Sequence, residues 1–365
     1  MKTKLLFFIV FLNISWLGNA QIYDAAKYIK GGKEDAVKMI AAYLMPIEHA
    51  IGFNGANNNI ILFKHKDDTS LHYGFGLDLT TSFININDYK YDVNELDLVN
   101  FEAVDPENSI AQTAAGSAET IALQTRTKYR TLSGSYPYFI EKPILTFNSA
   151  KGNAATYVPF PTIHLFAEKG GNAIDVKVLP SVKFTQNGEK IGLFNLGIYP
   201  QHNLATSSAF FSNLPVDFYV AGGYNYNRVT YYLDVKPNES YLTFSSNVDE
   251  EKYKNQSIQL HTSSIPIRFT VVKPINKVLV FANIGYNFLA SKVKMVGNYP
   301  IYASDPSDQY SIVATDIEDP FEYSHKFNSI SGTLGLNYRT DHITTGIKYN
   351  YSYYKNIDFS LSYIF

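Results

Sequence analysis

The last ten residues of the chain, 356–365, read NIDFSLSYIF. Every odd-numbered position from Ile357 to Phe365 is apolar, and the even-numbered positions are polar except Ile364. Successive side chains of a β-strand point to opposite faces, so this alternation predicts a strand with one apolar and one polar face. We therefore expect the chain to end in a strand of an antiparallel sheet.

The same alternation recurs along much of the chain. It is clear in 71–83, 328–339 and 343–353, and weaker in 278–288. One such strand fits any antiparallel sheet, including the alternative of a secreted β-sandwich, whereas a barrel in lipid requires alternation in nearly all of its strands. The expected strands are 59–65, 71–83, 119–131, 154–166, 172–186, 190–200, 214–236, 255–271, 276–294, 323–340, 341–354 and 356–365.

Composition favours the membrane barrel. The 365 residues include 29 Tyr and 25 Phe, and 18% are charged, below the usual quarter. Tyrosine suits the aromatic girdles of a barrel because its ring is buried in lipid while its hydroxyl stays in water. The net charge of −2 provides no basic field for nucleic acid, and the lack of Cys excludes disulfides and thiolate metal sites.

The N-terminus predicts export. Lys2 and Lys4 precede an apolar run at 5–12, and the small residues Gly18 and Ala20 follow it. This pattern is typical of a signal peptide at 1–20, cleaved after Ala20. The alternative, a membrane anchor, conflicts with the run's length, because a spanning helix needs about 20 apolar residues. We expect the bacterial outer membrane as the location.

The expected fold class is all-β: a transmembrane antiparallel up-and-down β-barrel of about 12 strands over 59–365. Because 84–152 is hard to parse, counts of 10–14 stay open. The connections at 237–254 and 295–322 are long, and those at 272–275 and 340–341 are tight. Bacterial barrels have long extracellular loops and short periplasmic turns, so the tight connections and both chain ends are expected in the periplasm.

The segment 21–58 differs from the rest because it predicts a helix. Gly31 and Gly32 precede its apolar positions, and Pro46 is expected to mark its end. A lumen of about twelve strands has room for such a helix as a plug. The equal alternative is a periplasmic amphipathic helix that rests on the membrane or caps the barrel floor. The apolar positions recur at three- and four-residue spacing: Ala36, Val37, Ile40, Ala41, Leu44 and Ile47.

Charged residues on the polar faces of the strands are the candidate lumen and solute-binding residues. A cation facing lipid at the bilayer midplane costs about 2 to 4 kcal/mol, so these charges are expected inside. Arg339, Lys348 and Asp358 lie on successive strands and are expected to form either one solute-selecting network or only part of the lumen's electrostatics. The candidates are Asp78, Asp175, Lys177, Lys183, Asp217, Arg339, Lys348 and Asp358.

No motif predicts an enzyme, a cofactor or a metal. The eight His are scattered without a metal-ligand pair, and neither a nucleophile elbow nor a phosphate loop is present. Membrane-barrel hydrolases assemble Ser and His across strands, so spacing alone does not exclude catalysis. The acidic stretches 88–107 and 305–322 lack calcium-loop spacing and are interpreted as solvated loops.

Several short motifs carry a family resemblance. They resemble a functionally uncharacterised outer-membrane barrel family of Bacteroidetes-type bacteria, whose build is similar to that of outer-membrane long-chain fatty-acid transporters. That resemblance implies an N-terminal plug inside a barrel and transfers no site residue. The motifs are AYLMP at 42–46, VPFP at 158–161, VKVLP at 176–180, GIYPQH at 197–202, LPVD at 214–217 and GGY at 222–224.

The function expected from these features is the binding or passage of a small apolar or amphipathic solute across the outer membrane. Leu279 and Phe281 are apolar residues on an otherwise polar face and are candidates for a solute path or for contact with a plug. The alternative is a structural or partner-docking barrel, such as a secretion-system accessory. The expected partners are outer-membrane lipid and the barrel-assembly machinery. Tyr363 and Phe365 resemble the carboxyl-terminal signal that this machinery recognises.

Overall fold

The computed structural model describes residues 25–57, 70–132, 139–154, 156–186, 189–236, 250–304 and 312–365. The expected signal peptide at 1–20, the expected strand at 59–65 and part of the acidic stretch 305–322 lie outside the described residues.

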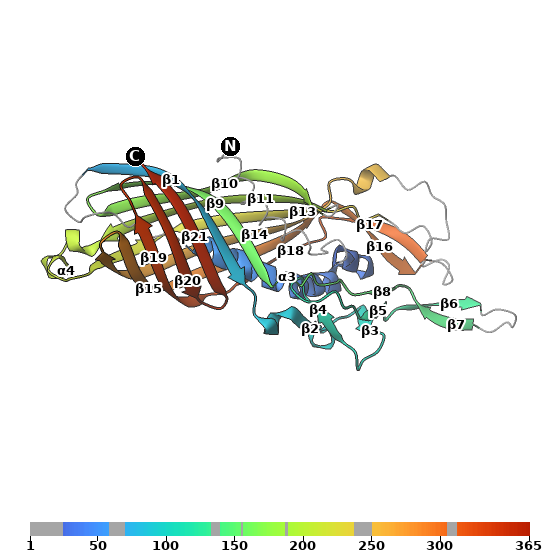
Figure 1. The fold of residues 1–365 in the computed structure, drawn as a ribbon. Helices are drawn as coiled ribbons and strands as arrows, with labels where there is room; N and C mark the ends of the chain where they lie inside the picture. The colour runs from blue at the N-terminus through green and yellow to red at the C-terminus, as the bar shows by residue number, and fades with distance from the viewer. Residues whose placement is uncertain are drawn as a thin grey trace.

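Ten strand positions form one closed antiparallel barrel, in which the pairing of β14 with β15 completes the ring (Figure 1). Two of the positions are interrupted. The short strand β12 (Asp217–Gly222) shares a position with β13, and β18 (Phe321–Lys326) shares one with β19. The ten are β1 (Leu71–Phe83), β9 (Tyr157–Lys169), β10 (Asn172–Gln186), β11 (Glu189–Asn203), β13 (Tyr224–Tyr232), β14 (Ser257–Ile275), β15 (Val278–Val296), β19 (Ser329–Arg339), β20 (Ile343–Tyr351) and β21 (Lys355–Ile364).

The expected count of about twelve is therefore not confirmed, although ten lies inside the expected range of 10–14. The main reason is the segment 119–131, whose strands β5 (Ala122–Thr125) and β6 (Lys128–Leu132) pair in small separate sheets. Local alternation shows that a segment is extended, but it does not show which sheet the segment joins.

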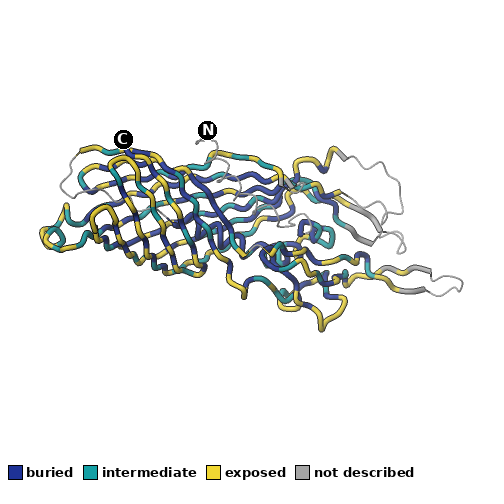
Figure 2. The backbone as a smooth tube through the Cα atoms, in the orientation of Figure 1, coloured by how far each residue is buried: buried dark blue, intermediate teal, exposed yellow. Residues whose placement is uncertain are grey.

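The outside of the barrel is an apolar belt. On β15 the outward residues Val278, Val280, Ile284, Tyr286 and Phe288 are all exposed. The alternation of exposed and buried residues follows the barrel strands (Figure 2). Aromatic residues collect at the two edges of the belt, as in membrane barrels. They are Tyr73, Tyr338, Tyr363 and Phe365 at one edge and Tyr286, Phe288, Tyr349 and Tyr351 at the other.

Charged residues replace the belt farther along β15. The outward side chains of Lys292 and Lys294 both pair with Glu322 on β18, the second at 2.8 Å. The strands at this end of the barrel therefore extend into a polar environment, because such exposed pairs are stable in water and costly in lipid.

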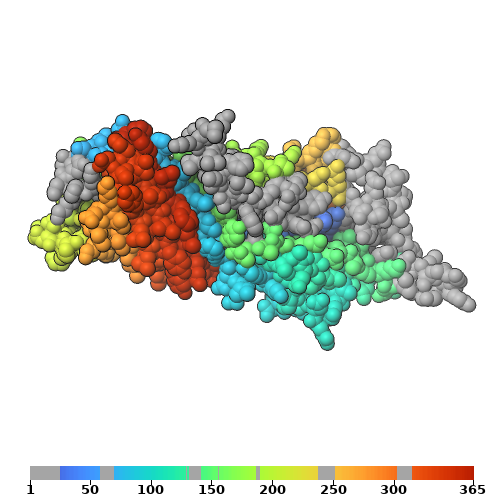
Figure 3. Space-filling view, viewed as in Figure 1, coloured from blue at the N-terminus to red at the C-terminus, as the bar shows by residue number. Residues whose placement is uncertain are grey.

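The two ends of the barrel differ in their connections. At the turn end, tight turns join β9 to β10, β14 to β15 and β19 to β20, and the short helix α4 (Ala209–Ser212) lies in the longer connection before β12. At the loop end, the described residues between 84 and 156 form an extension built from short strands and 3-10 helices. The hairpin of β16 (Asn298–Ser304) and β17 (Ile312–Glu318) lies at the same end. The space-filling view shows the extension projecting beyond the barrel (Figure 3).

The extension contains seven short strands and two 3-10 helices in its described residues. They are η3 (Ile86–Tyr89), β2 (Lys90–Asp92), η4 (Val93–Leu96), β3 (Phe101–Ala103), β4 (Ile110–Gln112), β5, β6, β7 (Phe139–Pro143) and β8 (Thr146–Asn148).

The predicted helix is present as α3 (Lys33–Ala56), preceded by the 3-10 helix η2 (Lys27–Gly31). Gly32 has φ of 117°, a conformation that glycine adopts without strain. The expectation that Pro46 ends the helix is wrong, because Pro46 lies inside it and ten further residues follow. Those ten are all buried, so packing outweighs the one backbone hydrogen bond that proline cannot donate.

Helix α3 enters the barrel from the loop end, which is the side opposite to the periplasmic floor expected for a cap. Its first half packs on the extension, where Asp35 accepts hydrogen bonds from the backbone N–H groups of Val99, Asn100 and Phe101 at 2.8, 2.6 and 2.7 Å. Its second half lies within the barrel and contacts β1, β9, β13, β14 and β15. Among the described residues, no helix has the length and apolarity needed to cross a membrane.

Candidate functional site

The carboxyl end of α3 is held inside the barrel by side chains from three strands. Lys177 Nζ on β10 lies 3.0 Å from the carbonyl oxygen of Asn57, and Arg268 on β14 donates to that of Ala56 at 3.0 Å. The Tyr199 hydroxyl on β11 donates to that of Gly55 at 2.7 Å. The last carbonyls of a helix lack donors within the helix and carry partial negative charge, so two cations and a hydroxyl stabilise this end.

A second set of contacts holds the middle of α3. Ser82 on β1 donates to the Ala50 carbonyl at 3.1 Å and to Asn54 Oδ1 at 2.7 Å. Asn54 itself donates to the Val158 carbonyl on β9 at 2.9 Å. Because each contact joins a side chain to a single atom across the lumen, the set fixes both the depth and the rotation of the helix.

A buried charged network follows the inner wall from β10 to β20. Lys177 Nζ lies 3.2 Å from Asp78 Oδ2 on β1, so the cation that caps the helix is also paired with a carboxylate. Lys348 Nζ lies 3.2 Å from Asp358 Oδ1, and Thr80 donates to Asp358 Oδ2 at 2.5 Å. Charges removed from water in this way need partners, and the ones present are mutual.

His164 on β9 lies within this network. Its Nδ1 is 3.2 Å from Asp175 Oδ1 on β10, and its Nε2 is 3.0 Å from Ser362 Oγ on β21. The same Nε2 is 3.8 Å from Asp78 Oδ1. Four strands thus converge on one imidazole that is 3% exposed.

Six of the eight predicted lumen residues are buried, and five of them belong to the network: Asp78, Asp175, Lys177, Lys348 and Asp358. The sixth, Arg339, lies at the turn end opposite Thr344, while Lys348 faces Gly335. Four residues along a strand span about 13 Å, so Arg339 is separated from the Lys348–Asp358 pair. Whether these residues bind a solute stays a prediction.

The other two predicted residues are placed differently. Asp217 begins β12 on the inward register and is half-buried at the turn end. The inward placement of Lys183 is wrong, because its side chain is exposed and lies 5.1 Å from the Tyr232 ring centroid. A register shift between Leu179 and Val182 reverses the alternation, so Lys183 faces outward.

Sequence reasoning missed His164, Arg268 and Ser362. Each lies on the polar face of an expected strand, so the alternation that selected the charged candidates also contained the signal. Ser362 is neutral, so a search for charged lumen residues does not select it. His164 has no neighbouring residue at metal-ligand spacing, so a search for metal sites does not select it either. The Leu279 and Phe281 side chains pack with Tyr219 and Val272 in a small cluster separate from the α3 core.

A second titratable cluster joins α3 to the wall above the belt. Glu48 accepts from Ser291 Oγ at 2.6 Å and from the Tyr323 hydroxyl, and its Oε2 is 3.8 Å from His325 Nδ1. His49 Nε2 lies 3.4 Å from His325 Nε2. Burial, and to a lesser degree His325, lowers the pKa of His49 to about 4, against the opposing effect of Glu48.

Among the described residues, one hollow lies on the barrel wall and another in the extension. The first, of about 440 Å³, lies at the turn end of β10, β11 and β12, and its lining includes Ile174, Gln201 and Val220. At this place β11 changes its pairing partner. Its pairing with β13 ends at Ile198–Tyr224, and its pairing with β12 begins at Gln201–Ala221.

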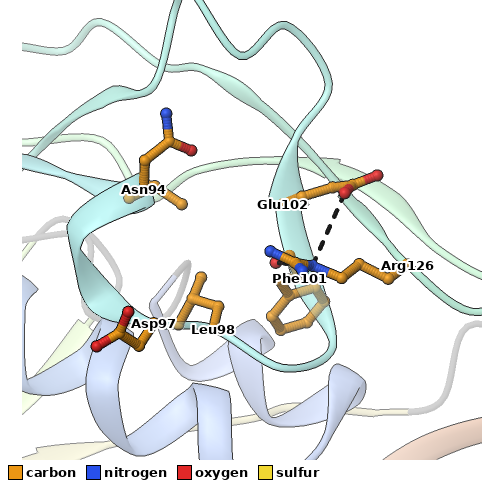
Figure 4. Close-up of a pocket in the computed structure, with 7 residues that line it drawn as sticks. Asn94, Asp97, Leu98, Phe101, Glu102 and Arg126 are labelled. Atoms are coloured by element: carbon orange, nitrogen blue, oxygen red, sulfur yellow. Dashed lines mark hydrogen bonds and ion pairs between the residues drawn. The ribbon is translucent and has the colours of Figure 1, made fainter.

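The other hollow, of about 310 Å³, lies in the extension (Figure 4). Arg126 Nε and Glu102 Oε2, 3.7 Å apart, line it beside Asn94 and Asp97. Arg126 and Glu102 are both more than a third exposed, so this is a solvated surface hollow. Among the described residues, no group of three or more His, Asp or Glu side chains is placed to hold a metal ion.

These features define the class: a closed ten-stranded antiparallel β-barrel with an N-terminal helix inside one end. The chain belongs to the "Family of unknown function (DUF6588)", whose model matches residues 1–365. The expectation of an uncharacterised family is therefore confirmed. No curated protein matches the chain.

Solved structures of outer-membrane barrels are similar at low levels. The outer membrane protease OmpT of Escherichia coli is 10% identical, with 83% of this chain and 99% of that chain covered and a TM-score of 0.31. The translocator domain of the autotransporter NalP of Neisseria meningitidis is 10% identical, with 89% and 99% covered and a TM-score of 0.26. A FadL homologue of Pseudomonas aeruginosa is 9% identical, with 82% and 90% covered and a TM-score of 0.22. Similarity at this level carries no argument about activity.

Proposed function

We propose that the protein is an integral outer-membrane barrel that binds or passes a small apolar or amphipathic solute, with α3 as its plug. The observation that carries the proposal is the combination of an apolar belt with a lumen helix held by polar contacts. The belt supports insertion in lipid. The long extension at 84–156 contrasts with the tight turns from β9 to β10, β14 to β15 and β19 to β20 at the opposite end, which supports the loop end as extracellular. The export signal expected at 1–20 is part of the proposal.

The described lumen is filled near α3, so passage requires this helix to move. Its contacts with the wall combine apolar packing, in which α3 residues such as Ile51 and Phe53 share one buried cluster with wall residues such as Leu289, with single hydrogen bonds to carbonyl oxygens. Each hydrogen bond is worth about 0.5 to 1.5 kcal/mol net, or somewhat more where the donor is charged. Below the helix, Leu279 and Phe281 give the wall an apolar patch, and the groove at β11 and β12 lies at the same end. These features support a path for a solute with an apolar part.

A cysteine pair between helix and wall tests the proposal, since the chain has no Cys of its own. Ala50→Cys with Ser82→Cys joins two residues already in contact. In proteoliposomes, uptake of hexanesulfonate, an amphipathic anion that crosses lipid slowly, should exceed that of empty liposomes. Oxidation of the double variant should stop uptake and reduction should restore it, while oxidant leaves the cysteine-free chain unchanged. Equal uptake by the oxidised and reduced forms would remove the plug from the mechanism.

A docking barrel is the second candidate, and the extension favours it. Residues 84–156 project beyond the strands and pack on α3, so they present a surface outside the belt. If uptake equals that of empty liposomes in every form, and deletion of 105–120 abolishes a co-purifying partner, the docking function replaces transport.

A further inference from the structure

We infer that Ser362, His164 and Asp175 form a nucleophilic serine site that cleaves small carboxylic esters entering the lumen from the turn end. The three residues come from β21, β9 and β10, and barrel closure brings them together. This inference goes beyond the proposed function and does not depend on transport.

The hydrogen bonds run in the order that activates a serine. Ser362 Oγ lies 3.0 Å from His164 Nε2, and His164 Nδ1 lies 3.2 Å from Asp175 Oδ1. One tautomer satisfies both contacts: Nδ1–H donates to Asp175, and the bare Nε2 accepts the proton of Ser362. A nucleophile, a base and a carboxylate that orients the base are the parts that such a site requires.

Neighbouring residues favour Asp175 as the orienting carboxylate. Asp78 is the other acid near the imidazole, but its Oδ2 is paired with Lys177 at 3.2 Å and its Oδ1 lies 3.8 Å from Nε2. Gly76 makes room for the ring, since a Cβ there would lie 2.1 Å from Nε2. The position of His164 against Ser362 therefore depends on a glycine at the cross-strand position.

The lumen beside Ser362 is less tightly filled than the wall around α3. Ser362 is 8% exposed, and the inward-facing neighbours Thr344, Gly346 and Ser360 are half-buried. Thr344 is directly opposite Ser362 and one residue from the start of β20 at the turn end. Phe166, Ala173 and Ile364 form an apolar cluster at this end. A short acyl chain fits these surroundings better than a charged substrate does.

The chemistry is acyl transfer to water. As Ser362 Oγ bonds to the ester carbonyl carbon, its proton passes to His164 Nε2. The ester C–O bond breaks, and the alcohol leaves with that proton. Water then gives a proton to Nε2 and attacks the acyl carbon, the Oγ–acyl bond breaks, and Ser362 recovers its proton as the carboxylic acid departs. Thr344 is the cross-strand partner of Ser362, so its hydroxyl is the nearest candidate donor to the oxyanion.

Covalent labelling of the full chain, folded in detergent, tests the site. A fluorophosphonate probe should modify Ser362, identified by mass spectrometry of its peptide, and p-nitrophenyl acetate should be hydrolysed. His164→Gln should slow both by at least about 10²-fold. It should also remove the dependence of the labelling rate on pH, a change that a structural histidine would not cause. Ser360→Ala, two residues away on the same face, is the matched control and should label normally.

Each variant is compared only if its gel migration changes on heating, as that of a folded barrel does. If a variant does not fold, labelling of the folded wild type still tests the site. If Ser362 of the folded wild type stays unlabelled, or labels equally in folded His164→Gln, the three residues are a structural hydrogen-bond network and the inference fails.

Discussion

Two lysines on β10 show how position rather than residue type decides the role of a charge. Lys177 is 3% exposed, pairs with Asp78 and caps α3. Lys183, six residues later, lies on the outer side of the wall beside Tyr232. The even spacing of the two lysines predicts that they lie on the same face of the strand. They lie on opposite faces because a bulge between them shifts the register.

Lys177→Met should lower the free energy of unfolding by about 3 to 5 kcal/mol, because it removes the cation paired with the buried Asp78 carboxylate and the contact with the Asn57 carbonyl. The double variant Asp78→Asn with Lys177→Met should recover a large part of that loss. Urea unfolding in lipid vesicles measures both. Lys183→Met is the control and should change stability by less than about 1 kcal/mol; an equal loss in the two single variants would contradict the burial argument.

The pH dependence of helix docking should depend on His49. Its folded-state pKa of about 4 lies below the unfolded value near 6.5, so the unfolded chain binds the proton more readily in that window. Stability should therefore fall as pH drops from 6.5 towards 4, by at most about 3 kcal/mol. The rings of His325, Tyr353 and Tyr354 lie against the imidazole, and the adjacent Glu48 acts on it electrostatically. Tyr323 contacts Glu48.

Unfolding measured across this pH range tests the role of His49. His49→Phe keeps an aromatic ring against Phe327 and should flatten the slope. If the free energy of unfolding depends on pH equally in the wild type and in this variant, the effect belongs to another titratable group.

At the scale of elements, α3 is the link between the barrel and the extension. Near its amino end, Asp35 accepts hydrogen bonds from three backbone N–H groups of the extension. Lys177 and Arg268 bind the carbonyl groups at its carboxyl end inside the barrel. The helix therefore carries opposite side-chain charges at its two ends, each in the sense that the helix dipole favours. A movement of α3 would pull on the extension as well as on the lumen.

Asp35→Asn should loosen this link, because the amide offers one acceptor oxygen where three donors converge. We expect a stability loss of about 1 to 3 kcal/mol and faster backbone hydrogen exchange at 99–101. Glu34→Gln, at the exposed neighbouring position, is the control and should exchange like the wild type. Unchanged protection at 99–101 in Asp35→Asn would show that the contact does not hold the extension.

At the scale of the whole molecule, the proposed membrane insertion assigns the belt and its aromatic edges the role of setting the depth of the barrel in a bilayer. Ile284 lies in the middle of the β15 belt and is 61% exposed, whereas Ile275 ends β14 at the turn end and is 50% exposed. The two positions share residue type and similar exposure, so they differ mainly in depth.

Ile284→Lys should cost about 2 to 4 kcal/mol of folding free energy in vesicles, and Ile275→Lys about 0 to 1 kcal/mol, because the penalty for a cation falls towards the interface. Equal effects would contradict the proposed depth. Recovery of the wild type as a water-soluble periplasmic protein would reject membrane insertion altogether.

The last residue also acts on the whole molecule. The Phe365 N–H donates to the Tyr73 carbonyl at 2.9 Å, and its ring stacks on Tyr73 at 5.3 Å, so it joins the barrel's first and last strands. Deletion of Phe365 should slow membrane assembly in cells more than it lowers the stability of the folded barrel. Comparison of membrane insertion with urea unfolding separates the two effects, and equal losses would assign the residue a purely structural role.

The sequence by itself determined that the chain forms alternating strands with an apolar outer face, an N-terminal helix and mostly inward charges such as Asp78 and Lys348. These features are local, because side-chain direction alternates along any extended segment. Only the tertiary structure decided the ten strand positions, the outward turn of Lys183, the continuation of α3 past Pro46 and the meeting of His164 with Ser362. Each depends on contacts with other segments of the chain, through strand pairing or, for α3, through packing in the lumen. Neither register, bulges nor barrel closure is encoded in the alternation of one strand.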